Sequence, residues 1–236
     1  MQTYHALVEW SKEITKRVWV ARFKLDLPPT MEFLAGQYCS FAIDKNLRRT
    51  FSITTPPSQH DGFEVCADVT PMGPGSVWLM NLKHGDRVEF LGPMGKFTLD
   101  GESKRNRVFI ATGTGIAPVR SMIYDTLFPA NNELRITNSE THLFWGLRYE
   151  GDMFWHEEIV NLTSDHPRFS YLLTLSQPSE TWSGKRGYVT DHLINLEALP
   201  TFDFYLCGNR GTIDSIKEFL LLHGVPQEQI KTELFF

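Results

Sequence analysis

The sequence predicts two domains, a small antiparallel barrel or sandwich followed by an α/β domain with a parallel sheet. Its 236 residues allow one large domain or two small ones. Up to about residue 99, short runs rich in Val, Phe and Tyr alternate with turn residues, as in antiparallel β proteins. After a polar junction at 101–107, strand-like runs alternate with helical ones, as in a parallel sheet covered by helices. We therefore expect one domain at 1–100 and another at 101–236.

The first domain is expected to contain six strands and one short helix, separated by glycine- and proline-containing turns. The helix is expected to begin at Ser76, because a serine hydroxyl is a favourable N-cap. The expected strands are 4–9, 18–25, 37–43, 50–54, 63–69 and 87–90.

The second domain is expected to alternate five strands with four helices. A strand followed by a crossover helix and a parallel strand is the unit of such sheets, so helices should cover both faces. The expected strands are 108–111, 142–145, 171–175, 202–206 and 230–234. The expected helices are 117–127, 155–162, 191–196 and 213–223.

The composition excludes several classes of protein. A net charge of −5 and a pI near 5.9 argue against nucleic-acid binding, which requires a basic face. No apolar run approaches the roughly 18 residues of a membrane span. The N-terminus has no apolar signal core, so we expect a cytoplasmic protein. Three widely spaced cysteines exclude a four-cysteine iron–sulfur cluster, and the histidine spacing predicts no metal site.

The strongest local signal is a strand that runs into a glycine-containing turn and then into a helix. Residues 107–118 read RVFIATGTGIAP. Glycines let the backbone approach a ligand closely, and the start of a helix attracts anions. The stretch therefore predicts a site for a dinucleotide phosphate, and the alternative is a plain tight turn between a strand and a helix.

A second signal combines a cation, an aromatic ring and hydroxyls on one expected strand. Residues 49–52 read RTFS, and the alternation of a strand places Arg49 and Phe51 on one face. Further on, residues 73–76 read GPGS and open the short helix. An arginine and a helix N-terminus both bind phosphate groups, so together they could hold one pyrophosphate. The alternative is an ordinary strand followed by a capped helix.

Taken in order, these motifs resemble those of the ferredoxin–NADP reductase family. The sequence contains R-x-F-S, G-x-x-S, G-P-x-G-x-F, G-T-G-I-A-P, C-G-N and a terminal E-x-F, from Gly36 to Phe235. The family includes flavodoxin reductases, flavin reductases and the reductase components of oxygenases. The resemblance implies an N-terminal Greek-key barrel that binds a flavin and a C-terminal α/β domain that binds a nicotinamide nucleotide.

The resemblance assigns roles in the flavin domain residue by residue. Arg49, with Thr50 beside it, matches the arginine that binds the flavin phosphate. Phe51 matches the aromatic residue that packs on one face of the isoalloxazine ring, and Ser52 matches the hydroxyl near flavin N5. The remaining matches are Gly75 and Ser76 at the pyrophosphate, which favours FAD, and Phe235 with Phe236 as a lid over the opposite flavin face.

The resemblance also assigns the nucleotide site and the catalytic groups. Cys207 and Gly208 match the motif near the nicotinamide, and Glu233 matches the acidic residue near N5. Without the resemblance, Cys207 would be interpreted as a buried strand residue and Glu233 as a solvated carboxylate. The catalytic set is therefore Ser52, Cys207 and Glu233. The expected nucleotide-binding residues are Gly113, Thr114, Gly115, Arg148, Ser176, Lys185, Cys207 and Gly208.

Three departures from the family pattern concern the ligands. Asp68 stands where relatives often have a basic residue, and the run after Cys207-Gly208-Asn209 lacks the proline that relatives often have. Gln177 stands where relatives that prefer NADPH often have an arginine. Lys185 and Arg186 are candidate replacements, or they simply solvate a loop. We therefore expect both nucleotides to be used, with a small preference for NADPH.

The resemblance predicts an FAD-dependent oxidoreductase that moves hydride between NAD(P)H and flavin N5. We expect a monomer that passes electrons to a separate ferredoxin- or flavodoxin-like carrier, without a fused iron–sulfur domain. The alternatives are a reductase component of an oxygenase, a reductase of free flavin and a non-catalytic nucleotide-sensing subunit.

Overall fold

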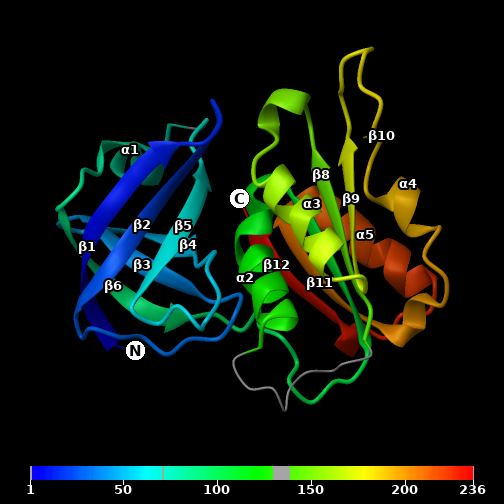
Figure 1. Cartoon of the computed structure of the whole chain (residues 1–236), viewed down its shortest axis with the longest axis horizontal. Coiled ribbons are helices and arrows are strands. Elements are labelled where there is room, and N and C mark those ends of the chain that lie inside the picture. Colours follow the sequence, from blue (N-terminus) through cyan, green and yellow to red (C-terminus); the bar gives the residue numbers. More distant parts are fainter. Residues whose placement is uncertain (1, 71, 130–138, 236) are drawn as a thin grey trace. The chain divides into compact units, whose positions relative to one another are not determined.

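Two compact units make up the chain. The computed structural model describes residues 2–70, 72–129 and 139–235 (Figure 1). The first unit consists of Met1–Leu99 with Ala117–Glu133, and the second of Asp100–Ile116 with Leu134–Phe236. None of the described helices is both long enough and apolar enough to span a bilayer.

The first unit contains an antiparallel barrel, as the sequence predicts (Figure 1). The strands pair in the order β4-β3-β6-β1-β2-β5, and a bridge between Ile53 and Val65 joins the chain after β4 to β5. Fully buried aromatic residues such as Phe23, Phe41 and Phe63 fill the interior. The strands are β1 (Gln2–Glu13), β2 (Val18–Leu27), β3 (Tyr38–Asp44), β4 (Leu47–Ser52), β5 (Gly62–Asp68) and β6 (Arg87–Met94).

The helix of the barrel begins earlier than expected. Helix α1 (Pro74–Asn81) has Gly73 as its N-cap, so the prediction that Ser76 caps it is wrong. Pro74 accounts for the earlier start, because its fixed φ suits the first helical position and its missing N–H costs nothing there. The Ser76 hydroxyl instead donates to the main-chain oxygen of Asp68 at 3.4 Å.

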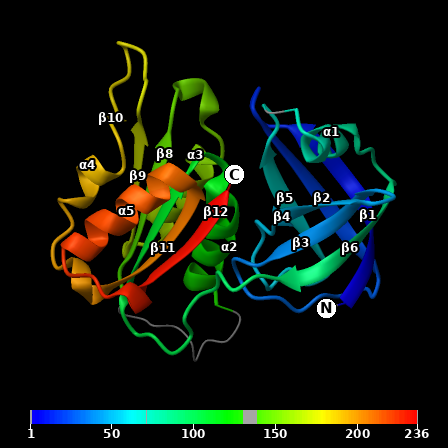
Figure 2. The same ribbon diagram turned by 180° about the vertical axis from the view of Figure 1, so that it is seen from behind.

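The second unit contains a parallel sheet in the order β10-β9-β8-β7-β11-β12. Helix α3 (His156–Asp165) lies on one face and α5 (Arg210–Leu222) on the other, as Figures 1 and 2 show together. The parallel pairing of the strands and the helices on both faces of the sheet agree with the sequence prediction. The strands are β7 (Asn106–Thr112), β8 (Thr141–Leu147), β9 (Phe169–Leu175), β10 (Lys185–Arg186), β11 (Phe202–Asn209) and β12 (Ile230–Phe235).

The remaining elements are short, apart from α2. Helix α2 (Ile116–Leu127) follows directly after the 3₁₀ turn η1 (Gly113–Gly115), and from Ala117 it groups with the barrel. Helix α4 (Thr190–Leu193) is shorter than the expected 191–196, because the amides of Asn195 and Leu196 bond three residues back, as in single turns. The other 3₁₀ turns are η3 (Glu150–Asp152), η4 (Leu199–Thr201) and η5 (Gln227–Gln229).

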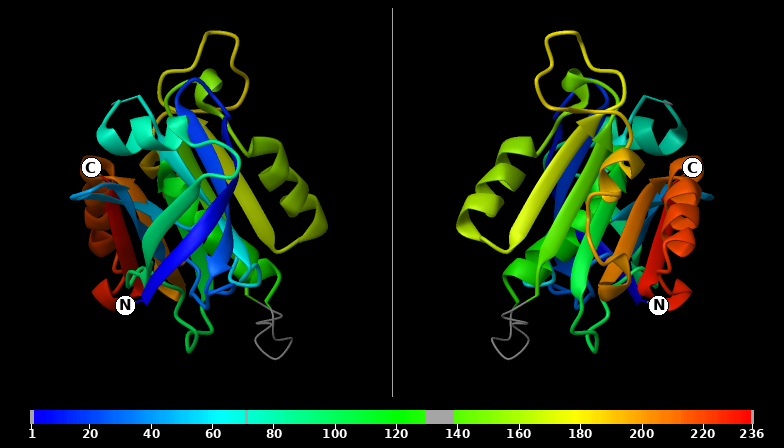
Figure 3. Two further views of the ribbon diagram at one scale, coloured as in Figure 1. Left: turned by 90° about the vertical axis from the view of Figure 1, so that its left-hand side faces the viewer. Right: turned by 90° about the vertical axis from the view of Figure 1, so that its right-hand side faces the viewer.

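The two-residue edge strand β10 was not expected from the sequence. It pairs in parallel with Thr174 and Leu175 of β9. Between β9 and β10 the chain forms a long loop, in yellow, that extends past the end of the sheet (Figure 3). Lys185, expected at the nucleotide site, lies on this edge strand.

Candidate functional site

In the barrel, three of the predicted flavin-binding residues come together. A Cβ atom placed on Gly75 would lie 3.1 Å from Cγ of Arg49 and 3.4 Å from Cζ of Phe51. Arg49 and Phe51 therefore lie on the same face of β4, as strand alternation predicts. A side chain at position 75 would occupy the space between the start of α1 and these two residues. The arrangement is a backbone cradle beside a cation, which fits the pyrophosphate of FAD.

The two adjacent arginines of β4 have different surroundings. Arg48 donates to the hydroxyl and the main-chain oxygen of Ser40, at 3.3 and 2.5 Å, and forms an ion pair with Glu89 at 3.3 Å. Arg49 is exposed, and its Nη1 donates to the main-chain oxygen of Arg48 at 2.8 Å. Arg49 is therefore the better placed of the two to bind a phosphate.

Phe51 packs into the aromatic core more extensively than the motif suggested. Its ring is stacked on Trp78 at a centroid distance of 5.8 Å and meets Phe41 edge-on at the same distance. Only 8% of Phe51 is exposed, and Ser52 is buried as well, at 6%. That Phe51 contacts the isoalloxazine ring stays a prediction. Trp78 was missed by the sequence reasoning, although its place three residues after Gly75 puts it one turn along the same helix.

Asp68, the acidic departure from the family pattern, has a partner of its own. Its carboxylate forms an ion pair with Arg17 at 2.8 Å and accepts hydrogen bonds from Thr70. Burial raises the pKa of Asp68, but the hydrogen bonds from Thr70 and Arg17 outweigh it and hold that pKa below its usual range. The carboxylate therefore remains charged and turned to Arg17.

In the second unit, the predicted phosphate turn lies directly against the predicted nicotinamide motif. A Cβ atom on Gly115 would lie 2.2 Å from the main-chain oxygen of Cys207 and 2.9 Å from Cα of Gly208. Only a glycine allows η1 to approach the end of β11 so closely. The indole Nε1 of Trp145 also donates to the main-chain oxygen of Gly113 at 3.0 Å and holds the turn from the other side. Contacts within the protein thus hold the turn in place.

Cys207 and Glu233 are neighbours across two parallel strands. They are register partners of β11 and β12, and Cys207 is completely buried. Burial, followed by the nearby Glu233, raises the pKa of the Cys207 thiol well above its usual range, so the group stays protonated. Burial also raises the pKa of Glu233 to about 7. Among the described residues, Oε2 of Glu233 is buried without a hydrogen-bond partner. This carboxyl group can hold or release a proton near neutral pH.

The remaining predicted nucleotide-binding residues lie where β8 and β9 end. The amides of Ser176 and Gln177 donate to the main-chain oxygens of Leu147 and Arg148, so the two strand ends are tied together. Arg148 is exposed and lies over the Tyr149 ring at 5.9 Å. The tyrosine hydroxyl donates to the side chain of Gln177 at 2.8 Å. Arg148 and Ser176 are therefore brought close together, as expected for one binding region.

Arg186 is occupied within its own loop. Its Nη2 donates to the main-chain oxygens of Ser179, Glu180 and Trp182 at 2.8 to 3.1 Å. This arginine therefore shapes the loop between β9 and β10. The cations that remain as phosphate ligands from the sequence prediction are Arg148 and Lys185.

The predicted lid is only partly described. The backbone of Phe235 pairs with Asn209 at the end of β12. The side chain of Phe235 and all of Phe236 lie outside the described residues. That the two phenylalanines cover the flavin stays a prediction.

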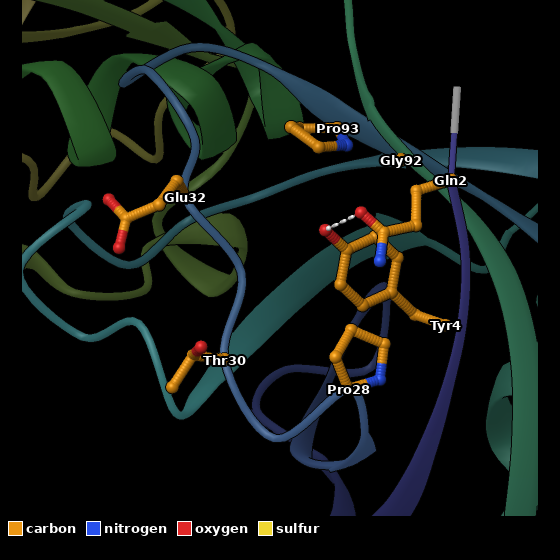
Figure 4. Close-up of a pocket in the computed structure, with 7 residues that line it drawn as sticks. All are labelled: Gln2, Tyr4, Pro28, Thr30, Glu32, Gly92 and Pro93. Atoms are coloured by element: carbon orange, nitrogen blue, oxygen red, sulfur yellow. Dashed lines mark hydrogen bonds between the residues drawn. The ribbon is translucent and has the colours of Figure 1, made fainter.

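A surface cavity of about 470 Å³ lies on the barrel away from these residues (Figure 4). In it, the Tyr4 hydroxyl points to Gln2 and donates to its side-chain oxygen at 3.2 Å. Its lining contains none of the predicted site residues; it consists of Gln2, Tyr4, Pro28, Thr30, Glu32, Gly92 and Pro93.

Two family models match the chain. Residues 5–99 match the oxidoreductase FAD-binding domain, and residues 109–218 match the oxidoreductase NAD-binding domain. The matched regions contain Arg49, Phe51 and Gly75 in the first case and Gly113, Gly115 and Cys207 in the second.

Curated relatives support the same assignment. The chain is 29% identical over 216 residues to ferredoxin–NADP reductase B of Sorangium cellulosum, covering 86% of this chain and 85% of that protein. It is 31% identical over 247 residues to the phenol 2-monooxygenase reductase component DmpP of a Pseudomonas species, covering 100% of this chain and 66% of that protein. The chain thus spans less than two thirds of the second relative.

Solved structures share the fold. A cytochrome P450 reductase from Amycolatopsis has a TM-score of 0.89 at 22% identity, over 99% of this chain and 70% of that one. A ferredoxin–NADP⁺ reductase from Neisseria gonorrhoeae, solved with FAD and NADP, has a TM-score of 0.85 at 18% identity over the whole of both chains. With a barrel that carries the FAD-binding signature and a parallel sheet that carries the nucleotide signature, the chain belongs to the ferredoxin–NADP reductase family of FAD- and NAD(P)-dependent oxidoreductases.

Proposed function

We propose that this protein transfers electrons from NAD(P)H through bound FAD to a separate one-electron carrier of the ferredoxin or flavodoxin type. The observation that carries the proposal is the convergence of Arg49, Phe51 and Gly75 at the start of α1. The similarity to a ferredoxin–NADP reductase over 85% of that relative's length supports the choice of carrier.

The residues of the chain have distinct tasks in this proposal. FAD, when bound, would supply the capacity to take up hydride and to give up electrons one at a time. Arg49 and the backbone at Gly75 hold the FAD phosphates, while the turn Gly113–Gly115 offers its amides to the phosphates of the nucleotide. Glu233 holds a proton on its buried carboxyl group. The Cys207 thiol stays protonated and does not act as a nucleophile, and its assigned place in this proposal is beside the nicotinamide site.

The first experiment asks whether the purified protein retains FAD and oxidises NAD(P)H. We expect a yellow protein that keeps its flavin through gel filtration and reduces an artificial one-electron acceptor. Reduction of purified ferredoxin and flavodoxin is then measured side by side. A colourless protein that reduces added flavin would instead be a reductase of free flavin, and failure with every acceptor would indicate a nucleotide-sensing subunit.

A second candidate function is that of a reductase component serving an oxygenase. The 31% identity to the phenol 2-monooxygenase reductase component over all of this chain favours it. To distinguish the two candidate functions, the protein is supplied with NADH and either a ferredoxin or an oxygenase component, and the turnover rates are compared. Faster turnover with the oxygenase component would replace the first proposal by the second.

A further inference from the structure

Two side chains of α2 donate hydrogen bonds to residues 53–55, the segment that follows β4. Thr54 and Thr55 are 0% and 2% exposed, so their main-chain groups have no access to bulk water. The Ser121 hydroxyl donates to the main-chain oxygen of Thr55 at 2.6 Å. Nη1 of Arg120 donates to the main-chain oxygen of Thr54 at 3.2 Å. All four residues belong to the first unit.

Two main-chain amides of this segment donate hydrogen bonds within the barrel. The amide of Ile53 donates to Gln37 at 3.0 Å, and the amide of Thr54 donates to the main-chain oxygen of Glu64 at 2.9 Å. Two prolines follow at positions 56 and 57, and they have no N–H to offer. The barrel thus accepts from the amides of Ile53 and Thr54, whereas α2 supplies donors to the carbonyls of Thr54 and Thr55. Because a buried carbonyl without a donor is costly, Arg120 and Ser121 restrict the conformation of the segment.

Arg120 is itself held in place by charge. Its guanidinium lies 3.7 Å from Oε2 of Glu64, and both side chains are largely buried, at 14% and 18% exposure. Glu64 also faces Arg22 at 3.7 Å, and Arg22 forms an ion pair with Glu9 at 2.7 Å. This chain of alternating charges connects β1, β2 and β5 to α2. A guanidinium fixed in this way keeps a defined distance to the Thr54 carbonyl.

Residues 53–55 follow directly after the residues that are assigned to FAD. Phe51 and Ser52 are the last two residues of β4, and Thr54 lies two positions after Ser52. We propose that Arg120 and Ser121 are positioning residues, which hold residues 53–55 so that the end of β4 has the conformation required for FAD. This inference rests on the proposed function, because it presupposes FAD at β4. Neither residue needs to touch FAD for this effect.

The test compares Ser121→Ala with a matched variant on the same helix. Thr126 also has a buried hydroxyl, but among the described residues this hydroxyl has no hydrogen-bond partner, so Thr126→Ala is the control. FAD is titrated into each apoprotein and followed by flavin fluorescence. We expect Ser121→Ala to raise the Kd for FAD by about tenfold, the scale of a lost buried hydrogen bond, and to shift the visible spectrum of bound FAD. Thr126→Ala should remain within about twofold of wild type, as for a substitution that breaks no contact.

Amide hydrogen exchange on the apoproteins supplies a readout that does not depend on FAD. Exchange at residues 50–55 should be faster in Ser121→Ala than in Thr126→Ala, while exchange in β1 and β2 stays unchanged. An unchanged Kd, an unchanged flavin spectrum and equal exchange in both variants would overturn the positioning role.

Arg120 keeps the proposal testable if Ser121→Ala does not fold. Arg120→Met removes the donor and the ion pair and should also weaken FAD binding, whereas Arg120→Lys keeps a cation and should recover part of the affinity. Wild-type affinity and spectrum in Arg120→Met would overturn the inference. If the wild-type protein itself does not bind FAD, the proposed function fails first. If it binds FAD and the variants bind equally well, only the positioning role fails.

Discussion

Arg48 and Arg49 are adjacent residues whose different surroundings lead to different predicted effects. Arg48 is committed to Ser40 and Glu89, whereas the exposed Arg49 lies beside the Gly75 cradle. We expect Arg49→Ala to weaken FAD binding by about 10- to 100-fold, because it removes a charge-assisted contact worth about 1.5–3 kcal/mol. FAD titration of the apoprotein measures this. Arg48→Ala is the control, and loss of FAD from Arg48→Ala alone would show that the assigned phosphate ligand is wrong.

The buried carboxyl group of Glu233 makes stability depend on pH. Its pKa of about 7 in the folded protein lies above the ordinary value of 4.5, so the folded state binds more protons than the unfolded state between these values. The contribution of Glu233 to stability therefore falls as the pH rises from about 4.5 to about 7, by an amount on the order of 3 kcal/mol, and then levels off.

Glu233→Gln should remove this dependence. The variant should be more stable than wild type at pH 8 and close to it at pH 4.5, because the amide stays neutral at both. Thermal unfolding at several pH values measures the difference. The exposed Glu228 offers a control in Glu228→Gln, which should leave the wild-type profile intact. Parallel profiles for wild type and Glu233→Gln would contradict a titrating buried carboxyl group.

At the scale of secondary-structure elements, the contact between η1 and β11 shapes the nucleotide site. Gly115→Ala would place a methyl group 2.2 Å from the Cys207 oxygen, so the turn and the strand end must separate. We expect nicotinamide nucleotides to bind at least about tenfold more weakly, with FAD still retained by the barrel. Calorimetric titration with NAD⁺ and NADP⁺ provides the measurement.

Gly211→Ala is the matched control for this change. Gly211 lies near the start of α5, where an added Cβ would meet its nearest atom at an ordinary 3.5 Å. Weakened nucleotide binding in Gly211→Ala and not in Gly115→Ala would place the phosphates at α5 instead of η1.

At the scale of the whole molecule, the preference between NADPH and NADH is measured as the ratio of their kcat/KM values. Arg148 is exposed beside the ends of β8 and β9, while Arg186 is tied to its own loop. We expect NADPH and NADH both to be used, with NADPH slightly favoured. Because one arginine–phosphate contact is worth about 1.5–3 kcal/mol, Arg148→Ala should lower the NADPH/NADH ratio of kcat/KM about tenfold or more. Lys217→Ala on α5 should leave the ratio unchanged, and an unchanged ratio in Arg148→Ala would remove its assigned role.

Much of the architecture and part of the site follow from local patterns. The alternation of Arg49 and Phe51 predicts that they share a face, and their common contact with Gly75 agrees with it. The run RVFIATGTGIAP predicts a strand, a turn and a helix, and β7, η1 and α2 occupy these positions. Such predictions succeed because strand and helix periodicity, and the turn preference of glycine, act between residues that are close in the sequence.

The tertiary structure alone decided the features that depend on distant segments. Glu233 is an ordinary carboxylate in the sequence, and its raised pKa comes from its burial next to β11. Trp78 was expected only as part of a short helix, yet it stacks on Phe51 from 27 positions away. The hydrogen bond from Ser121 to Thr55 spans 66 positions. Burial and close approach depend on how the whole chain packs, whereas secondary structure is encoded by neighbouring residues, and for this reason the elements were predictable and these contacts were not.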